Sequence, residues 1–289
     1  CFLLYVLAGM DTFNAVNHAF TTVATGGFST ADNSMAQFDS LTILWIASVF
    51  MALGGMPFFL FVRVLNGHYT ALWRDDQVRF FLKILVGMAL LLTVHRGLTT
   101  DVGLWEAFSH AMFNVTSVVT TSGFASEDYS LWGPLAVSVF FFLTFVGGCS
   151  GSTSGGMKVF RFQLSMMLLR EQIMRLIHPR AVISRRYNRR IISDDIIASS
   201  VAFSFVFLAS LALITLILAM LGLDLVTSLT GAATALANVG PGLGPIIGPA
   251  GNFAPLPDAA KYVLSVGMLL GRLELLSVLV LFSPDFWRR

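Results

Sequence analysis

Charged side chains are scarce in this sequence: Asp, Glu, Lys and Arg make up 12% of its 289 residues, whereas 56% are hydrophobic. Soluble domains carry about 25% charged residues. A deficit spread along the whole chain leaves too little polar surface to cover a soluble globule and excludes that class. Crossing a hydrocarbon core takes about 20 apolar residues. The predicted spans are residues 41–62, 79–95, 131–146, 196–223 and 262–282.

Cysteine is also rare, since only Cys1 and Cys149 are present, and a disulfide framework is excluded. The sequence has no paired metal-ligand spacing, no nucleophile constellation and no phosphate-cradling loop after a strand. These absences argue against an enzyme and against a nucleotide site in this chain. The chain opens on Cys1 inside an apolar run, so we expect it to begin in mid-element, with a preceding part missing.

Positive charge is concentrated in two regions. Nine of the eighteen Lys and Arg residues lie between 158 and 190, and four more lie between 63 and 83. Membrane-protein loops rich in Lys and Arg stay on the cytoplasmic side. The linkers 65–78 and 178–192 are therefore expected to be cytoplasmic. Because the basic segments alternate with spans that contact membrane lipid, nucleic acid is not an expected partner.

The order span, short semi-polar helix, Gly-rich loop, span occurs three times, which predicts a repeat architecture. The short helices are predicted at 11–24, 102–120 and 225–237. The predicted units are 1–64, with a truncated leading helix, 79–177 and 193–289. Asp11 and Asp224 occupy equivalent positions, which predicts two helix N-caps. His18 and His110 precede their loop glycines by nine and thirteen residues, so the second short helix is expected to be one turn longer.

The three loops align on Gly27, Gly123 and Gly240 at intervals of about one hundred residues. Irregular backbone at membrane depth is tolerated only inside protein or against a water-filled cavity. Its free carbonyls can replace the hydration shell of a cation, and the negative end of a short helix dipole favours that cation. The pattern therefore predicts an all-α integral membrane protein of repeated helix–pore-helix/loop–helix units around a central ion pore. The alternative is that these glycines only cap helices or allow close helix packing.

Several segments resemble those of the TrkH/TrkG potassium-uptake family over essentially the whole chain. They are residues 24–30, 147–158, 178–182, 238–245 and Gly271-Arg272-Leu273-Glu274. The loop 238–257 and Phe282-Ser283-Pro284 favour this family over the related KtrB and plant HKT proteins. The resemblance implies four repeats in one chain, of which three are visible here. It also implies K⁺ as the ion, a homodimer in the bacterial cytoplasmic (inner) membrane, and a cytosolic TrkA-type ring that carries the nucleotide.

Carried over by position, the resemblance assigns a selectivity filter that binds K⁺. Its residues are Thr25, Gly26, Gly27, Thr121, Ser122, Gly123, Asn238, Val239 and Gly240. The stretch 147–156 holds five Gly and four Ser or Thr, too many for a stable helix at about 1 kcal/mol per Gly. A helix kink is one interpretation, and the resemblance implies an intramembrane gate. The gate glycines are Gly147, Gly148, Gly151, Gly155 and Gly156.

Three charged residues are expected to belong to the gate. Arg272 is predicted near the middle of the last span, where a guanidinium costs at least about 2.5 kcal/mol. It is expected to set an electrostatic barrier to cations, with a purely structural ion pair as the alternative. Glu274 should lie on another helix face and pair with a neighbouring span. Lys158 is either a second positive element of the gate or snorkels to the cytoplasmic surface.

The sequence therefore predicts potassium uptake through a channel-like pore with a backbone-carbonyl filter, gated by the loop and a cytosolic partner. An ion-coupled secondary transporter, a symporter of K⁺ with H⁺ or Na⁺, also has Gly-interrupted helices, but in one or two places rather than in every repeat. A membrane anchor or receptor subunit acting through the link 178–192 is the third hypothesis.

Overall fold

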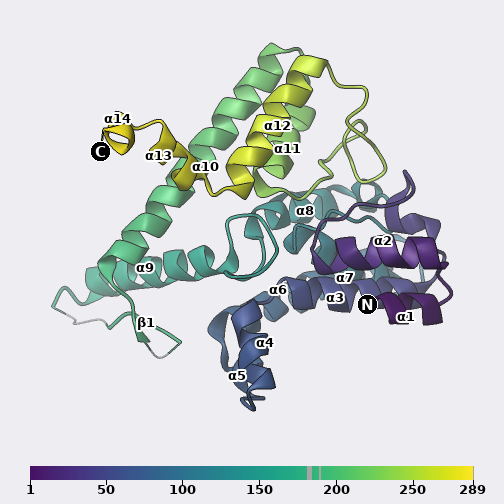
Figure 1. The fold of residues 1–289 in the computed structure, drawn as a ribbon, viewed down its shortest axis with the longest axis horizontal. Helices are drawn as coiled ribbons and strands as arrows, with labels where there is room; N and C mark the ends of the chain where they lie inside the picture. The colour runs from purple at the N-terminus through teal and green to yellow at the C-terminus, as the bar shows by residue number, and fades with distance from the viewer. Residues whose placement is uncertain (181–183, 189, 289) are drawn as a thin grey trace.

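The structure, a computed structural model, describes residues 1–180, 184–188 and 190–288, and these are mostly helical (Figure 1). The predicted residues Ala181, Val182 and Arg189 of the basic link lie outside the described part. The first helices are α1 (Phe2–Leu7), α2 (Thr12–Val23), α3 (Leu41–Gly54), α4 (Phe58–Leu65), α5 (Ala71–Arg74), α6 (Asp76–Thr99) and α7 (Leu104–Val119). The remaining helices are α8 (Pro134–Val146), α9 (Val159–Ile177), α10 (Asp194–Met220), α11 (Leu225–Ala237), α12 (Asp258–Arg272), α13 (Leu275–Leu281) and α14 (Pro284–Trp287). Two 3₁₀ turns cover Ser34–Gln37 and Tyr129–Trp132.

A helix that ends at an irregular loop stands between two other helices in each of the three units. The helix α2 packs on α1 and α3, α7 packs on α3, α6 and α8, and α11 packs on α10 and α12. Three apolar clusters, around Met51, Phe81 and Phe207, join residues of different units, since Ala52 and Ala237 both belong to the cluster of Phe81. The repeat order expected from the sequence is therefore present in the fold.

The predicted short helices are confirmed within a few residues, and α7 has 16 residues against 12 in α2, which confirms the extra turn. Both predicted N-caps are also confirmed. Asp11 accepts from the Asn14 N–H at 3.1 Å, and Asp224 accepts from the Thr227 N–H at 3.0 Å. The bond from Asn14 lowers the pKa of Asp11.

Two helices of the described part, α6 and α10, are long and apolar enough to cross a membrane by themselves. The helix α8 begins at Pro134, later than the predicted start of the third span at residue 131. The prediction of one continuous span over 41–62 is wrong, because α3 and α4 meet at an angle of 92°. Pro57 has no N–H to donate, and in a continuous helix its ring would clash with the carbonyl four residues earlier. The helix therefore breaks there.

The prediction of one continuous span over 262–282 is also wrong. The helix α12 ends at Arg272, and α13 starts at Leu275 after Glu274 adopts a left-handed φ of 59°. Arg272 therefore lies at a helix end and not at mid-helix.

The basic link contains a small hairpin that the sequence did not indicate. Strands β1 (Arg186–Tyr187) and β2 (Arg190–Ile191) pair antiparallel. The link is anchored at Arg185, whose guanidinium bonds the carboxylates of Glu171 in α9 and Asp194 in α10. Arg185 thereby lowers the pKa of Glu171.

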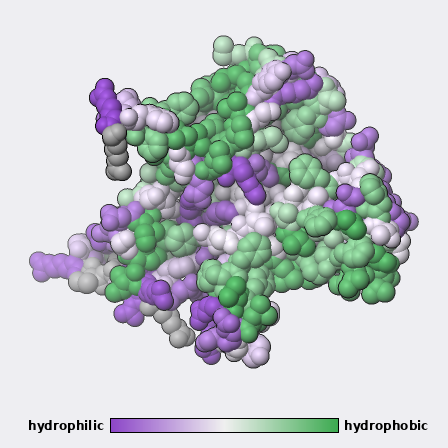
Figure 2. Space-filling view, in the orientation of Figure 1, coloured by the Kyte–Doolittle hydropathy of each residue, from purple (hydrophilic) through white to green (hydrophobic). Residues whose placement is uncertain are grey.

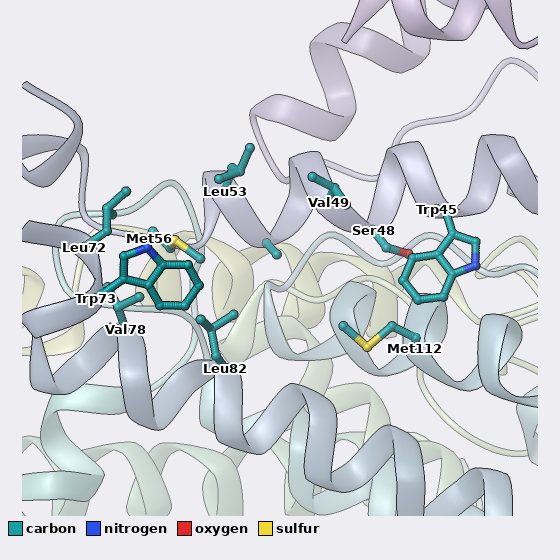
Figure 3. Close-up of a pocket in the computed structure, with 11 residues that line it drawn as sticks. Trp45, Ser48, Val49, Leu53, Met56, Leu72, Trp73, Val78, Leu82 and Met112 are labelled. Carbon is teal, nitrogen blue, oxygen red and sulfur yellow. The ribbon is translucent and has the colours of Figure 1, made fainter. Parts of the chain in front are cut away.

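The surface is hydrophobic over wide areas of α10, α12 and the first three helices, while hydrophilic side chains gather near α9 and α5 (Figure 2). An apolar pocket of about 310 Å³ opens between α3, α5, α6 and α7. Trp45 and Trp73 stand at its two ends (Figure 3). None of the predicted filter or gate residues lines this pocket.

Two helical glycines give a matched test of the packing of α12 on α11. A Cβ on Gly271 would lie 1.9 Å from the Leu236 carbonyl oxygen, whereas a Cβ on Gly87 meets nothing within 4 Å. We expect Gly271→Ala to lower the melting temperature of the purified protein by several degrees, because α12 must move away from α11. Gly87→Ala should leave it unchanged or slightly higher. Equal melting temperatures would contradict the packing of α12 on α11.

Candidate functional site

The three loops after α2, α7 and α11 have the same backbone geometry. Each begins with a residue in the left-handed region: Thr25 at φ 49°, Thr121 at φ 56° and Asn238 at φ 58°. The next residue donates its N–H to the carbonyl five residues earlier: Gly26 to Thr21 at 2.7 Å, Ser122 to Ser117 at 2.8 Å and Val239 to Thr234 at 3.1 Å. This is the Schellman arrangement for ending a helix. The third residue, Gly27, Gly123 or Gly240, again has a positive φ.

Threonine is an unusual residue for the left-handed position. A β-branched side chain is strained there, at a cost of about 1–3 kcal/mol, and such strain concentrates at functional sites. Gly would relieve the strain, yet Thr25 and Thr121 each use the hydroxyl that Gly lacks. The strain therefore indicates that the hydroxyls are needed, and their partners lie in the segment 147–156.

The loops lie against one another in chain order. A Cβ on Gly27 would lie 1.7 Å from the Ser122 carbonyl oxygen, and a Cβ on Gly123 would lie 2.0 Å from the Val239 carbonyl oxygen. Only glycine leaves room for these close approaches. Gly240, the third aligned glycine, approaches Gly123 Cα. The structure thus brings together the nine predicted filter residues, which come from segments far apart in the sequence.

A hydroxyl six residues before each aligned glycine also belongs to this site, and the sequence reasoning missed it. Thr21 Oγ1 donates to the Phe28 carbonyl at 2.9 Å, and Ser117 Oγ donates to the Phe124 carbonyl at 2.7 Å. Thr234 Oγ1 instead accepts from the Gly240 N–H at 2.9 Å. Each hydroxyl ties the outer part of its loop to the short helix. The alignment on the glycines would have found these residues, since all three copies have Thr or Ser there.

The segment 147–158 is not helical (Figure 1). It forms hydrogen bonds with two of the three loops. Thr25 Oγ1 donates to Thr153 Oγ1 at 2.9 Å. The Gly155 N–H donates to Thr121 Oγ1 at 2.6 Å. A Cβ on Gly155 would also lie 2.5 Å from the Ala237 carbonyl oxygen at the end of α11. The segment 147–158 therefore contacts the ends of all three helices α2, α7 and α11 where their loops begin.

The same loop also supplies partners to the broken helix α3–α4. The Gly54 carbonyl accepts from the Thr153 hydroxyl at 3.1 Å, and the Gly55 carbonyl accepts from the Cys149 N–H at 2.8 Å. In return, the Phe58 N–H donates to the Gly151 carbonyl at 3.0 Å. These residues were missed because 41–62 was expected to be continuous. The run Gly54-Gly55-Met56-Pro57 was the available signal.

The predicted gate glycines occupy crowded positions, except Gly151. A Cβ on Gly147, Gly148 or Gly156 would lie within 3 Å of another atom of the loop or of Gly55. A Cβ on Gly151 meets only Pro57 Cβ at 4.0 Å, so Gly151 is set by its φ of 80°. The loop is thus folded tightly on itself and is more than a kink between α8 and α9.

The charged gate candidates converge on this loop. Arg272 Nη1 donates to the Thr153 carbonyl at 3.1 Å, and among the described residues it makes no ion pair. The Lys158 ammonium turns back onto the Ser154 carbonyl instead of reaching outward. Glu274 Oε2 lies 3.5 Å from Arg161 Nη2 on α9, the neighbouring helix expected for it.

Repeated helices, left-handed caps and glycine-tight loops define a membrane protein of the pore-loop class. The model of the family described as TrkH, cation transport protein, matches residues 4–289, and the chain belongs to this family of transport proteins, not enzymes.

Named relatives agree with the family. The chain is 54% identical to the Trk system potassium uptake protein TrkI of Halomonas elongata, over 99% of this chain and 58% of that protein. It is 36% identical to the Trk system potassium uptake protein TrkH of Escherichia coli, over 100% of this chain and 59% of that protein. The solved structure of the potassium transporter TrkH from Vibrio parahaemolyticus is similar, with a TM-score of 0.93, 34% identity and coverage of 100% of this chain and 62% of that one. The chain thus spans about three fifths of the length of these relatives.

Removing the hydroxyl of Ser117 tests its role in holding the loop that follows α7. Ser117 is fully buried, and Ser117→Ala leaves the Phe124 carbonyl without this donor. We expect a loss of about 1–3 kcal/mol and a melting temperature lower by several degrees. Ser138→Ala, which removes an exposed hydroxyl bonded to Pro134 on α8, is the matched control and should have little effect. A Ser117→Ala protein as stable as the control would contradict the assignment.

Proposed function

We propose that this chain forms part of a channel-like pore for potassium uptake across the bacterial cytoplasmic membrane. The observation that supports the proposal is the common geometry of the three loops. Gly27 and Gly123 each pack against a carbonyl oxygen of the next loop, so the loops form part of a ring. Carbonyl oxygens held in such a register can replace the water around a cation. The relatives described above are named as potassium uptake proteins, which supports K⁺ as that cation.

The proposed filter comprises the nine residues of the three loops, with K⁺ held by backbone carbonyls and the negative ends of α2, α7 and α11 directed at it. The loop 147–156 is the proposed gate, since it lies under the inner ends of these loops. Arg272 fastens the gate through the Thr153 carbonyl and adds positive charge on the cation path. Lys158 and Glu274 support the same closed arrangement, through Ser154 and Arg161.

The partners proposed for the complete protein are a second copy of it and a cytosolic TrkA-type nucleotide-binding ring. The basic linkers 63–83 and 158–192 are the proposed docking surface, because they hold 13 of the 18 Lys and Arg residues, and loops rich in these residues stay on the cytoplasmic side. A nucleotide would then act through the ring and not on this chain.

Flux of ⁸⁶Rb⁺ into liposomes containing the full-length protein tests the filter. Gly123→Ser places a side chain where the Val239 carbonyl oxygen lies, so we expect loss of saturable, K⁺-selective flux by at least tenfold. Gly103→Ser, at the start of α7 with nothing within 4 Å of a Cβ, is the control and should conduct normally. Unchanged selectivity in the Gly123→Ser protein would overturn the filter assignment.

Arg272 gives a test of the gate. Arg272→Ala removes the bond to Thr153 and a positive charge, so we expect ⁸⁶Rb⁺ flux without the cytosolic partner to rise several-fold. Lys261→Ala, which removes a cation paired with Asp258 near the other end of α12, should leave flux unchanged. If Arg272→Ala also conducts at the original rate, Arg272 has no part in closing the pore.

A further inference from the structure

A buried polar cluster at the cytoplasmic start of α6 has no role in the filter or gate described above. Asp75 and Gln77 are 5% and 6% exposed, next to the linker 65–78. Burying polar side chains is costly unless hydrogen bonds compensate. Their partners therefore indicate what the cluster holds in place.

Gln77 holds the gate loop. Its Oε1 accepts from the Ser150 N–H at 2.8 Å. Ser150 follows Cys149, whose own N–H bonds the Gly55 carbonyl of the broken helix. The Gln77 side chain thus fixes the side of the loop opposite to the one that contacts the filter.

Asp75 joins Gln77 to the basic hairpin. One carboxylate oxygen of Asp75, Oδ1, caps α6 by accepting from the N–H groups of Gln77 at 2.9 Å and Val78 at 3.2 Å. The other, Oδ2, accepts from Asn188 Nδ2 at 2.8 Å. Asn188 lies in the turn between β1 and β2 with a φ of 45°. One carboxylate therefore links the hairpin turn to the residue that holds the gate loop.

Further hydrogen bonds hold the hairpin against Asp76 in α6 and Gln163 in α9. Asn188 Oδ1 accepts from the Asp76 N–H at 2.9 Å, and the Asn188 N–H donates to Asp76 Oδ2 at 3.0 Å. The Tyr187 hydroxyl donates to Gln163 Oε1 at 3.1 Å, and Gln163 Nε2 donates to the Asp76 carbonyl at 2.9 Å. The hairpin thereby contacts the start of α6 and the helix α9, which follows the gate loop in the chain.

We infer that Asp75 and Gln77 are positioning residues that connect the cytosolic hairpin β1–β2 to the gate loop, so that displacing the hairpin loosens the loop at Ser150. The hairpin exposes Arg186 and Arg190, so the acidic surface of a cytosolic protein is the chemistry suited to displace it. The consequence for ion flux rests on the proposed function. The mechanical link does not, because it depends only on the hydrogen bonds.

The native thiol of Cys149 reports on this link. It is fully buried in the gate loop beside Ser150, so its rate of modification measures loosening of the loop. We would use the full-length protein in native membranes, with Cys1 and any other cysteine replaced by Ser, and follow labelling by N-ethylmaleimide. Asn188→Gly removes the side chain and keeps the left-handed φ, and Gln77→Met removes the acceptor at constant length.

Gln77→Met, which loses one hydrogen bond, is expected to raise the Cys149 labelling rate about two- to tenfold. Asn188→Gly, which loses two side-chain hydrogen bonds, is expected to raise it at least as much. The double variant should label no faster than the faster single variant, because the two residues act in series. Gln77→Glu keeps an acceptor and should restore slow labelling. Asn66→Gly, in an exposed cytoplasmic turn, is the control and should label as slowly as the parent.

Unchanged labelling in both single variants, or effects that multiply in the double variant, would overturn the link. Measuring ⁸⁶Rb⁺ flux on the same proteins separates the two proposals. Fast labelling in the variants of a protein that carries no selective flux supports the link and refutes the proposed function.

Discussion

Backbone groups released from a helix at membrane depth need hydrogen-bond partners, and this need organises the centre of the molecule. The break at Pro57 frees the carbonyls of Gly54 and Gly55, and the loop 147–156 supplies donors to both. The loop has released groups of its own, which are taken up by Phe58, Thr121 and Arg272. Two irregular segments that would each be costly alone therefore stabilise one another.

This mutual dependence makes the loop a shared contact of all three units. It bonds Thr25 and Thr121, and it packs on the end of α11 through Gly155. Gln77 bonds it at Ser150. Single hydrogen bonds thus fasten the loop at several points around its length.

Much of this arrangement was predictable from local sequence. The short helix α11 has the boundaries that the sequence indicated, and the N-caps at Asp11 and Asp224 were predicted correctly because capping is a local effect. The alignment of Gly27, Gly123 and Gly240 predicted a common register that the backbone shows. The roles of these residues in ion flux remain predictions. The predictions of continuous spans over 41–62 and 262–282 were wrong. Hydropathy does not detect a helix break when the N–H and carbonyl groups that it frees are bonded elsewhere in the chain.

The sequence by itself determined the class of the protein, since apolar runs, charge-poor composition and repeated glycines act through solvent and local backbone sterics. It also indicated the aligned glycines of the three loops, but not the left-handed φ of Thr25 and Thr121. The tertiary structure alone decided where the chain bends and what each charged residue meets. Arg272 at the end of α12 reaches Thr153, and Glu274 beyond that end reaches Arg161 on α9. Similarly, Asp75 and Asn188 are more than one hundred residues apart, and no local pattern encodes their bond. Such contacts depend on how the units pack, which is a property of the whole chain.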